Sequence, residues 1–302
     1  MLESFDNRTG VIWYNNRFVP WREACVHVLS HGLHYASAVF EGERVYDGVV
    51  FKLDDHTQRL HESAKMMGFT LPFDSETISR ATYELLHRQG IKNGYVRPIA
   101  WRGSEMMAIS AQRNTIHMAI AAWEWPSYFD PDTRKKGIRL GYTPWRRPPA
   151  NTAPVHAKAA GLYMICTLSK HHVEKKGYDD ALMLDHHGHI AESTGANIFF
   201  VINDALHTPI PDCFLDGITR QCVIDIAQRQ GIDVCERVIT PKDVESADAA
   251  FLTGTAVEVT PIASIETVRL KGHPLVDTLI EAFQAYVRQT CHHHKTCESV
   301  SL

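Results

Sequence analysis

A polar segment that contains prolines divides this chain of 302 residues into two parts. After Trp125 the sequence reads PSYFDPDTRKKG over residues 126–137. Polar, proline-bearing segments of this kind connect compact domains. The chain is also longer than a single hydrophobic core usually supports. We therefore expect a smaller domain over residues 1–125, a connection over residues 126–137, and a larger domain over residues 138–302.

The first part alternates strand and helix patterns. Residues 11–19 predict two strands around an Asn-Asn turn, and an Asp-Gly pair marks a second hairpin within residues 39–52. Start and stop signals predict one helix over residues 54–68 and another from residue 74 or 75 to residue 89. Residues 95–101 and 115–123 have the apolar patterns of two further strands. These elements predict a small α/β domain.

The second part mixes helices and strands without a strict β-α-β rhythm. Helices are predicted over residues 161–176, 219–230 and 274–290, and a hairpin is predicted over residues 181–190. No glycine fingerprint for a dinucleotide is present, which argues against a Rossmann domain. The whole chain is therefore predicted to be of the α/β class in its mixed, α+β form.

Composition excludes several classes of function. The formal net charge of −4 provides no field that would attract nucleic acid or an anionic membrane surface. No apolar run reaches the length that spans a bilayer, and residues 1–6 lack the features of a signal peptide. The seven cysteines include no CxxC pair, which favours reduced thiols over a disulfide framework. We expect a cytoplasmic enzyme.

Lys158 lies among small, uncharged neighbours in residues 151–163, NTAPVHAKAAGLY. A lysine in water has a pKa of about 10.4, and burial with few compensating charges favours the neutral amine. A neutral lysine amine can form a Schiff base with a carbonyl compound. The alternative is a solvated lysine in a turn rich in alanine and glycine, so other segments must decide between the two.

Three other segments carry a resemblance to a known family. They are residues 191–197 (AESTGAN), 215–221 (LDGITRQ) and 252–258 (LTGTAVE), with near-matches over residues 26–31 and 35–42. Together with the lysine segment they resemble the class IV aminotransferases, the fold-type IV enzymes of pyridoxal 5′-phosphate. Within that family the chain is most similar to bacterial branched-chain amino acid aminotransferases, from about residue 11 to about residue 283. The resemblance implies a small N-terminal α/β domain and a larger, pseudobarrel-like C-terminal domain.

The resemblance assigns cofactor contacts to particular residues. Lys158 would form the Schiff base, Glu192 would keep the ring nitrogen protonated, and Tyr163 would hydrogen-bond the phenolic oxygen. The phosphate would lie at a helix start, where backbone N–H groups bind anions. The residues implied for the phosphate are Arg59, Gly217, Ile218, Thr219 and Thr255.

The resemblance also implies a substrate site for small amino acids and 2-oxo acids. Tyr95 and Arg97 match a strand whose arginine serves the side-chain carboxylate of glutamate. The turn at Thr255 and Ala256 would bind the α-carboxylate through backbone N–H groups. The matches for the apolar walls of the pocket are Tyr35, Phe40 and Trp125, and those for a loop from a neighbouring subunit are Met107 and Ile109. A homodimer or a larger homo-oligomer is therefore expected.

The implied reaction is transamination between branched-chain L-amino acids (leucine, isoleucine or valine) and 2-oxoglutarate. Lys158 would remove the substrate's α proton and return it at the cofactor, with ping-pong kinetics. One methylene group changes discrimination by only about 1–3 kcal/mol, so the three amino acids are not ranked by sequence.

Two charged pairs depart from the family pattern. Arg102 either faces the pocket, which would alter the preference for amino acids, or pairs with Glu105 at the surface, which would change nothing. Glu43 and Arg44 lie near the predicted pocket mouth, where they are expected to form a solvated pair.

Other functions compete with this one. A D-amino acid aminotransferase of the same fold typically has an Arg-x-His pair where this chain has Tyr95 and Arg97, which favours the L-enzyme. An (R)-selective amine aminotransferase or an aminodeoxychorismate lyase matches the pocket residues less well. A protein that holds the cofactor without catalysis is disfavoured by the presence of Lys158 and Glu192.

A metal protein is a further alternative. His27, His31 and His34 have helical spacing, but their surroundings match the aminotransferases, where these histidines are not ligands. Cys291, Cys297 and the histidines of residues 292–294 resemble a metal-binding tail that lies beyond the family match. We expect no bound metal.

Overall fold

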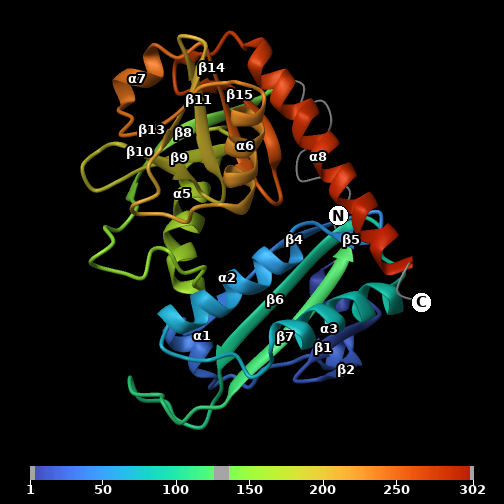
Figure 1. The fold of residues 1–302 in the computed structure, drawn as a ribbon. Helices are drawn as coiled ribbons and strands as arrows, with labels where there is room; N and C mark the ends of the chain where they lie inside the picture. The colour runs from blue at the N-terminus through green and yellow to red at the C-terminus, as the bar shows by residue number, and fades with distance from the viewer. Residues whose placement is uncertain (1–3, 126–135, 300–302) are drawn as a thin grey trace. The chain divides into compact units, whose positions relative to one another are not determined.

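The computed structural model describes residues 4–125 and 136–299, which fold into two compact units (Figure 1). The first unit comprises Met1–Pro126, Ala157–Gly161 and Cys291–Leu302, and the second comprises Ser127–His156 and Leu162–Thr290. The segment that carries Lys158 thus packs with the first unit, although it follows most of that unit in sequence. The connection predicted over residues 126–137 lies outside the described residues except for its last two, and the predicted domain boundaries stay a prediction.

The first unit is built on an antiparallel sheet of seven strands. Its order is β2-β1-β7-β6-β4-β5, and β3 also pairs with β6. The strands are β1 (Val11–Tyr14), β2 (Arg17–Pro20), β3 (Ala38–Phe40), β4 (Glu43–Tyr46), β5 (Val49–Val50), β6 (Gly94–Arg102) and β7 (Ile116–Glu124).

The two predicted hairpin turns of this sheet are confirmed. Asn15 and Asn16 join β1 to β2 with φ angles of 47° and 64°. Asp47 and Gly48 join β4 to β5 with φ angles of 50° and 84°. Two consecutive residues with positive φ are typical of a type I′ turn, which matches the twist of paired strands and favours asparagine, aspartate and glycine.

Helices cover one face of this sheet. They include α2 (Leu53–Met66) and α3 (Ser75–Gln89), and the short α1 (His31–Tyr35) precedes β3. The predicted boundaries of α3 are confirmed, because the Asp74 side chain accepts a hydrogen bond from the Thr77 N–H and Gly90 ends the helix with φ of 66°. The apolar faces of α2 and α3 pack on side chains that include Val45, Val96, Ala100, Met118 and Ile120. Even-numbered residues of β6 therefore face the core, and odd-numbered residues face the opposite side.

The second unit contains a mixed sheet of nine strands. Its order is β10-β9-β8-β15-β14-β11-β12-β13, with β16 paired to β15. The strands are β8 (Ile138–Arg146), β9 (Asp180–Leu184), β10 (Ile190–Ser193), β11 (Asn197–Ile202), β12 (Ala205–Pro209), β13 (Val234–Arg237), β14 (Ala249–Gly254), β15 (Glu258–Ile265) and β16 (Val268–Arg269). Parallel pairs, such as β8 with β9, occur beside antiparallel ones, as expected for the mixed class.

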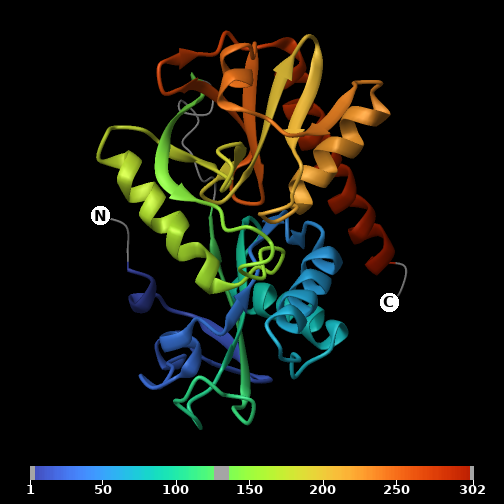
Figure 2. The ribbon, with the colours of Figure 1, turned by 90° about the vertical axis from the view of Figure 1, so that its left-hand side faces the viewer.

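The helices of the second part lie close to their predicted positions, except for one short helix over residues 241–245, which was not predicted. They are η3 (Ala160–Tyr163), α5 (Met164–Glu174), α6 (Ile218–Arg229), α7 (Pro241–Glu245) and α8 (Pro274–Ser299). Figure 2 shows α5 running alongside β8, against which it packs. The predicted end of the last helix at residue 290 was too early, because residues 275–299 contain no glycine or proline that would stop it. In the part of the chain that the structure describes, no helix is both long and apolar enough to cross a bilayer.

Candidate functional site

In the first unit, Lys158 is held between β3 and α2. Its carbonyl oxygen accepts a hydrogen bond of 3.1 Å from the Phe40 N–H, and its own N–H donates to Oγ of the buried Ser63 at 2.9 Å. The next residue, Ala159, forms an isolated β-bridge with Val39. The Lys158 ammonium group lies 5.1 Å from the centre of the Phe40 ring. The backbone of Lys158 is therefore fixed from two sides, and its side chain lies over an apolar ring.

The same ring connects Lys158 to other predicted site residues. The Arg97 guanidinium lies 4.9 Å from the centre of the Phe40 ring and 5.4 Å from that of Tyr95. The ring of Tyr95 packs edge-on against Trp125, with centroids 4.7 Å apart. Tyr95 and Arg97 are odd-numbered residues of β6, so they project on the face of the sheet opposite α2 and α3. The structure thus gathers these five predicted residues into one cluster.

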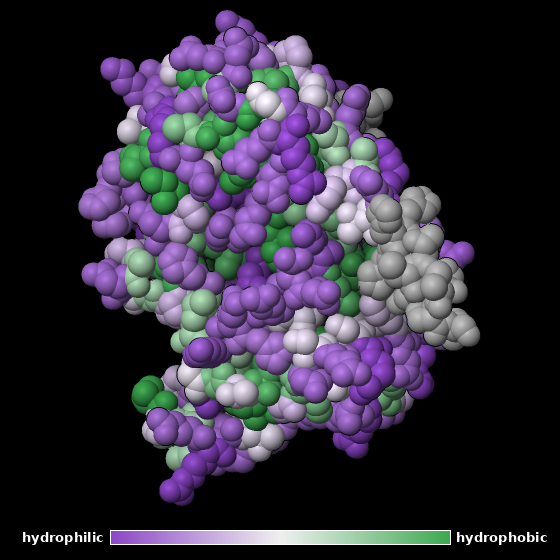
Figure 3. All heavy atoms as spheres, viewed as in Figure 1, coloured by the Kyte–Doolittle hydropathy of each residue, from purple (hydrophilic) through white to green (hydrophobic). Residues whose placement is uncertain are grey.

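Tyr35 and Ile109 are exposed in the first unit, and Met107 is half-buried. The Tyr35 hydroxyl donates to the Met107 carbonyl at 3.4 Å, and the Ile109 side chain is 83% exposed. Figure 3 shows hydrophobic residues at the surface at the lower left, where Figure 1 draws α1 and the loop between β6 and β7. Within the first unit alone, these residues do not complete a pocket around Phe40.

Arg59 on α2 makes a forked ion pair with a carboxylate that sequence reasoning left without a role. The carboxylate of the fully buried Glu41 accepts hydrogen bonds from Nε and Nη2 of Arg59 at 2.6 and 2.8 Å and contacts His56 Nδ1 at 2.7 Å. Burial alone would raise the pKa of Glu41, but Arg59 and His56 outweigh it and hold this pKa well below its ordinary value. Burial lowers the pKa of His56, although Glu41 opposes that effect. Since an ionised carboxylate only accepts, neutral His56 carries its proton on Nδ1.

The predicted solvated pair of Glu43 and Arg44 is wrong. Both side chains are buried, because β4 lies inside the sheet between β5 and β6. The Arg44 guanidinium donates to the Trp125 carbonyl oxygen at 2.6 Å, so it supports the backbone beside the aromatic cluster.

Arg102 was expected either to face the pocket or to pair with Glu105 at the surface, and neither alternative describes its contacts. Its guanidinium donates to the carbonyl oxygens of Gly68 at 2.7 Å and Ala111 at 3.0 Å, and it lies over the Phe69 ring. Glu105 instead accepts from the Thr115 N–H. Arg102 therefore ties the loop after β6 to the end of α2 and does not pair with Glu105.

In the second unit, Glu192 is buried on β10 beside a buried cation. Arg147 Nε lies 3.5 Å from one carboxylate oxygen of Glu192, and Asn197 Nδ2 donates to the other oxygen at 3.2 Å. Burial lowers the pKa of Arg147, but Glu192 and the neighbouring Cys166 and Tyr163 outweigh burial and raise it above its ordinary value. Arg147 therefore stays a cation that compensates the charge of Glu192.

Asn197 also connects Glu192 to the start of α6. Its Oδ1 accepts from the Gly217 N–H at 3.1 Å, and its Nδ2 donates to the Leu215 carbonyl oxygen at 3.0 Å. Gly217 is the N-cap of α6, and the predicted residues Ile218 and Thr219 form its first turn. The first N–H groups of a helix lack intrahelical partners, so this turn can bind an anion.

Thr255 and Ala256 lie in the turn between β14 and β15, half-buried. A Cβ atom built on the preceding Gly254 would lie only 3.2 Å from the Cβ of Ala196, so this turn lies against the segment that joins β10 to β11. Tyr163 ends η3 and is half-buried. The second unit thus brings the remaining predicted residues to the surroundings of Glu192, Asn197 and α6.

Sequence reasoning assigned no role to Glu41, His56, Arg147 or Asn197. Two weak signals were available. Glu41 is a charge between the strand residue Phe40 and a glycine, and Asn197 closes the matched segment of residues 191–197. Arg147, in a run of arginines and prolines, gave no periodic signal that it would be buried.

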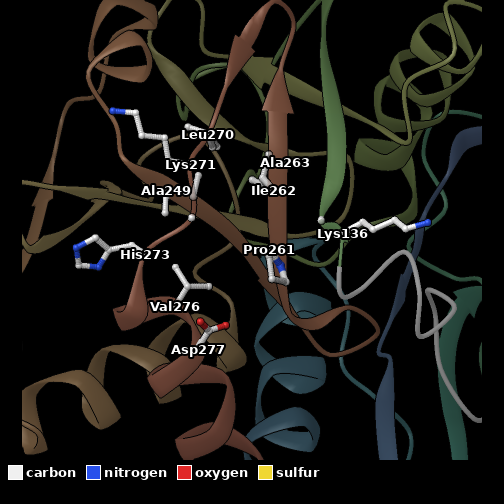
Figure 4. Close-up of a pocket in the computed structure, with 13 residues that line it drawn as sticks. Lys136, Ala249, Pro261, Ile262, Ala263, Leu270, Lys271, His273, Val276 and Asp277 are labelled. Atoms are coloured by element: carbon white, nitrogen blue, oxygen red, sulfur yellow. The ribbon is translucent and has the colours of Figure 1, made fainter.

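Two cavities lie away from most of these residues. One of about 380 Å³ in the first unit has mostly apolar walls, with Arg97 among its lining residues. Another, of about 240 Å³, lies near the start of α8 in the second unit (Figure 4). In Figure 4 the ammonium groups of Lys136 and Lys271 point to opposite sides, and Pro261 and Ile262 lie between them. None of the predicted site residues lines this second cavity, so we do not assign the site to it.

The histidines considered as metal ligands make other contacts. Nδ1 of His31 is bonded to the Ser37 hydroxyl and Nε2 to the Ala108 carbonyl, His27 Nδ1 accepts from a backbone N–H, and His34 Nε2 bonds a carbonyl. Over residues 4–125 and 136–291, no group of three or more histidine, cysteine, aspartate or glutamate side chains could hold a metal ion. The side chains of residues 292–297 lie outside the described residues.

Comparison with known proteins gives consistent results. The sequence model described as "Amino-transferase class IV" matches residues 38–265. A protein of Rickettsia bellii named "Probable branched-chain-amino-acid aminotransferase" is 41% identical over 292 residues, which cover 95% of this chain and 100% of the relative. A "Branched-chain-amino-acid aminotransferase" of Pseudomonas aeruginosa is 36% identical, with 93% of this chain and 94% of the relative covered.

Solved structures agree with these relatives. The branched-chain aminotransferase of the archaeon Thermoproteus uzoniensis with norvaline superimposes with a TM-score of 0.88 at 36% identity, covering 93% of this chain and 95% of that one. The corresponding Escherichia coli enzyme gives a TM-score of 0.89 at 33% identity, covering 92% and 94%. A further branched-chain amino acid aminotransferase, of the organism abbreviated T.th., was solved with pyridoxamine 5′-phosphate and gives a TM-score of 0.89 at 37% identity, covering 93% and 94%. The fold of the chain is therefore that of the fold-type IV aminotransferases.

Proposed function

We propose, from the premise that the chain belongs to the class IV aminotransferases, that it exchanges amino groups between branched-chain L-amino acids and 2-oxoglutarate. One observation carries this proposal. Lys158, Phe40, Tyr95 and Arg97 form one cluster in a chain that matches branched-chain aminotransferases over nearly its whole length. The family membership supports an aminotransferase, and the names of the relatives support the substrate class.

The cofactor of this family is pyridoxal 5′-phosphate, and the residues present fit it. In the first unit the Lys158 amine and the Arg59 guanidinium suit this cofactor, and in the second unit Glu192 with its compensating Arg147 suits it. The first turn of α6, with Gly217 at its N-cap, supplies N–H donors suited to a phosphate. When bound, the cofactor withdraws electrons from the substrate's α carbon and so makes the α proton acidic.

The roles of the protein groups follow from their chemistry. Lys158 Nζ would bind the cofactor covalently in the resting enzyme and, once released, take the substrate's α proton and return it. Glu192 would hold a proton at the ring nitrogen, and Arg147 and Asn197 fix the orientation of its carboxylate. Tyr163 is assigned to the phenolic oxygen, and Thr219 and Thr255 to the phosphate.

Arg97 is the residue proposed to recognise the second carboxylate of glutamate and 2-oxoglutarate. Its planar guanidinium suits a carboxylate and is held over two aromatic rings. Phe40, Tyr35 and Trp125 would contact the apolar side chain, and the N–H groups of Thr255 and Ala256 would hold the α-carboxylate. One site would thus accept either an apolar or an acidic side chain.

The active form is proposed to be a homodimer in the cytoplasm. The exposed side chains of Tyr35 and Ile109, with Leu33 and Val26 beside the apolar cavity, present hydrophobic surface on the first unit. Contact with a second copy would remove this surface from water. It would also let Met107 and Ile109 complete the partner's pocket.

The proposal is tested by adding L-leucine or D-alanine to the purified protein loaded with pyridoxal 5′-phosphate, without any 2-oxo acid. L-leucine alone should remove the visible absorbance of the bound cofactor, and later addition of 2-oxoglutarate should restore it. A change with D-alanine alone would establish the D-amino acid enzyme instead.

Two variants and one control variant sharpen this test. Lys158→Ala should abolish the absorbance change, whereas Lys176→Ala, at an exposed lysine of the second unit, should leave it intact. Arg97→Met should raise KM for 2-oxoglutarate at least tenfold more than KM for leucine, because it removes the only proposed cation for the second carboxylate. Equal changes for both substrates would contradict the role of Arg97.

A further inference from the structure

Glu43 is a buried carboxyl group that the proposed reaction does not use. It begins β4, is 1% exposed, and projects on the same face of the strand as Val45, which belongs to the core beneath α2 and α3. Within the described residues, neither of its carboxyl oxygens has a hydrogen-bond partner. Such a group is uncommon in a folded protein and needs a physical explanation.

The protonation state of Glu43 follows from its surroundings. An isolated, buried carboxylate costs far more free energy than a buried neutral carboxylic acid. Burial raises the pKa of Glu43 well above its ordinary value, the charge of Glu41 raises it further, and Arg59 opposes both effects only in part. Glu43 is therefore the neutral member of a pair of carboxyl groups, and Glu41 is the ionised one.

The charged and titratable groups that act on Glu43 form a small set. Glu41 precedes it by two residues, and α2 contributes Arg59 and His56, both of which contact Glu41. On the neighbouring strand β6, its cross-strand partner is the apolar Val96. With Glu43 and His56 neutral, the charges that act on Glu43 are one anion, Glu41, and one cation, Arg59. Lys158 also acts on His56.

We propose that Glu43 is a positioning residue for the phosphate end of the site. Because Glu43 is a neutral carboxylic acid, Arg59 is paired with only one carboxylate. This inference rests on the proposed function, in which Arg59 contacts the phosphate of the cofactor. Nε and Nη2 of Arg59 already donate to Glu41. A carboxylate at Glu43 would add a second negative charge that acts on Arg59, and so would weaken the attraction of the guanidinium for the phosphate. Proton binding by Glu43 and phosphate binding near Arg59 therefore strengthen one another.

The sign of the effect on pH dependence follows directly. As the pH rises, Glu43 ionises, and the affinity for the cofactor falls by more than the titration of the cofactor itself explains. Glu43→Gln keeps the size of the side chain but stays neutral at every pH, so its affinity lacks this additional decrease. Asp180→Asn is the matched control, since it also replaces a buried carboxyl of raised pKa but lies in the second unit, beside Lys170 and Thr194.

The experiment measures the dissociation constant of pyridoxal 5′-phosphate from the holoenzyme between pH 7 and pH 10 for these three proteins. The dissociation constants of wild type and Glu43→Gln should agree within about twofold at pH 7. At pH 10 wild type should bind the cofactor about tenfold more weakly than Glu43→Gln, a factor typical of coupling between two sites. Asp180→Asn should follow wild type. The inference would be overturned if the ratio of the two dissociation constants, wild type to Glu43→Gln, stayed constant from pH 7 to pH 10. It would also be overturned if Glu43→Gln already bound the cofactor tenfold more weakly than wild type at pH 7.

A second measurement needs no cofactor. The infrared spectrum of the wild-type protein at pH 7 should contain the C=O band of a buried carboxylic acid that disappears as the pH rises and is absent from Glu43→Gln. If wild type has no such band, Glu43 is ionised and the inference is wrong even where cofactor binding is normal. A wild-type protein that takes up no cofactor would instead refute the proposed function, and the inference with it.

Discussion

Replacement of Gly217 by alanine tests how the start of α6 is linked to Glu192. Gly217 has φ of −69°, a value that alanine adopts freely, so the backbone itself opposes nothing. The obstacle is steric, since an added Cβ would lie 2.3 Å from Oδ1 of Asn197. Ordinary contacts between heavy atoms lie at about 3.5 Å, so either the loop or Asn197 must move by about 1 Å.

That movement breaks specific hydrogen bonds. Asn197 Oδ1 accepts from the Gly217 N–H at 3.1 Å, and the amide of Asn197 also holds Glu192 and the Leu215 carbonyl. Overpacking costs about 1–3 kcal/mol, and a buried polar group left without its partner costs about 1–3 kcal/mol more. Because the same displacement causes both effects, we expect Gly217→Ala to lower the free energy of unfolding by roughly 2–4 kcal/mol.

Urea unfolding of the cofactor-free protein measures this change. Gly195→Ala is the matched control, because a Cβ at Gly195 meets no atom within 4 Å, and it should change stability by less than about 1 kcal/mol. In an Asn197→Ala background the clashing oxygen is gone, so Gly217→Ala should then cost about 1 kcal/mol or less. The steric explanation fails if Gly217→Ala costs the same in both backgrounds, or no more than Gly195→Ala.

Three further predictions address other contacts. A Cβ on Gly42 would lie 1.9 Å from the Tyr95 hydroxyl, so Gly42→Ala should displace that ring and lower kcat/KM for leucine about tenfold or more; unchanged steady-state kinetics would contradict this. In α7, a hydrogen bond from Thr240 is the main cause that lowers the pKa of Asp243 to about 2, from an ordinary value of 3.8. The stability that Asp243 adds is therefore present above pH 4 and lost as the pH falls toward 2, so the difference in Tm between wild type and Asp243→Asn should shrink over that interval. Arg102→Met should speed amide hydrogen exchange in the loop after β6 without changing the preference among amino acids, whereas a changed preference would place Arg102 in the pocket.

Much of the first unit was predictable because its signals are local. The positive φ angles of Asn15, Asn16 and Gly48 belong to turns that the sequence names directly, and Asp74 and Gly90 set the ends of α3 through contacts within a few residues. The end of α8 was harder to predict, since no local stop signal follows residue 290. Strand order was not predictable either, because the pairing of β8 with β15 joins residues far apart in sequence.

The residues of the candidate site also differ in how far the sequence predicted them. Lys158 and Glu192 were proposed because they occur in segments that resemble a family, and Arg59 because it matches a family position on the helix predicted over residues 54–68. Their partners were not predicted. Burial of Glu43 could not be read from the sequence, where a charged residue beside Arg44 suggests a solvated pair. Ser63, which holds the Lys158 backbone, lies 95 residues earlier in the chain and carries no signal of that contact. Contacts of this kind depend on tertiary packing, which a single sequence does not display.

The buried charges show how each unit is prepared for the proposed chemistry before any ligand binds. Glu41 is compensated by Arg59 in the first unit, and Glu192 by Arg147 in the second, so each carboxylate has its cation within the same unit. A buried carboxylate that loses its cation is left uncompensated, and such losses typically cost about 3–5 kcal/mol. The supporting residue Arg147 is therefore required first for the stability of the second unit and only then for the orientation of Glu192. Selection for a stable fold thus also maintains the carboxylate that we assign to the cofactor's ring nitrogen.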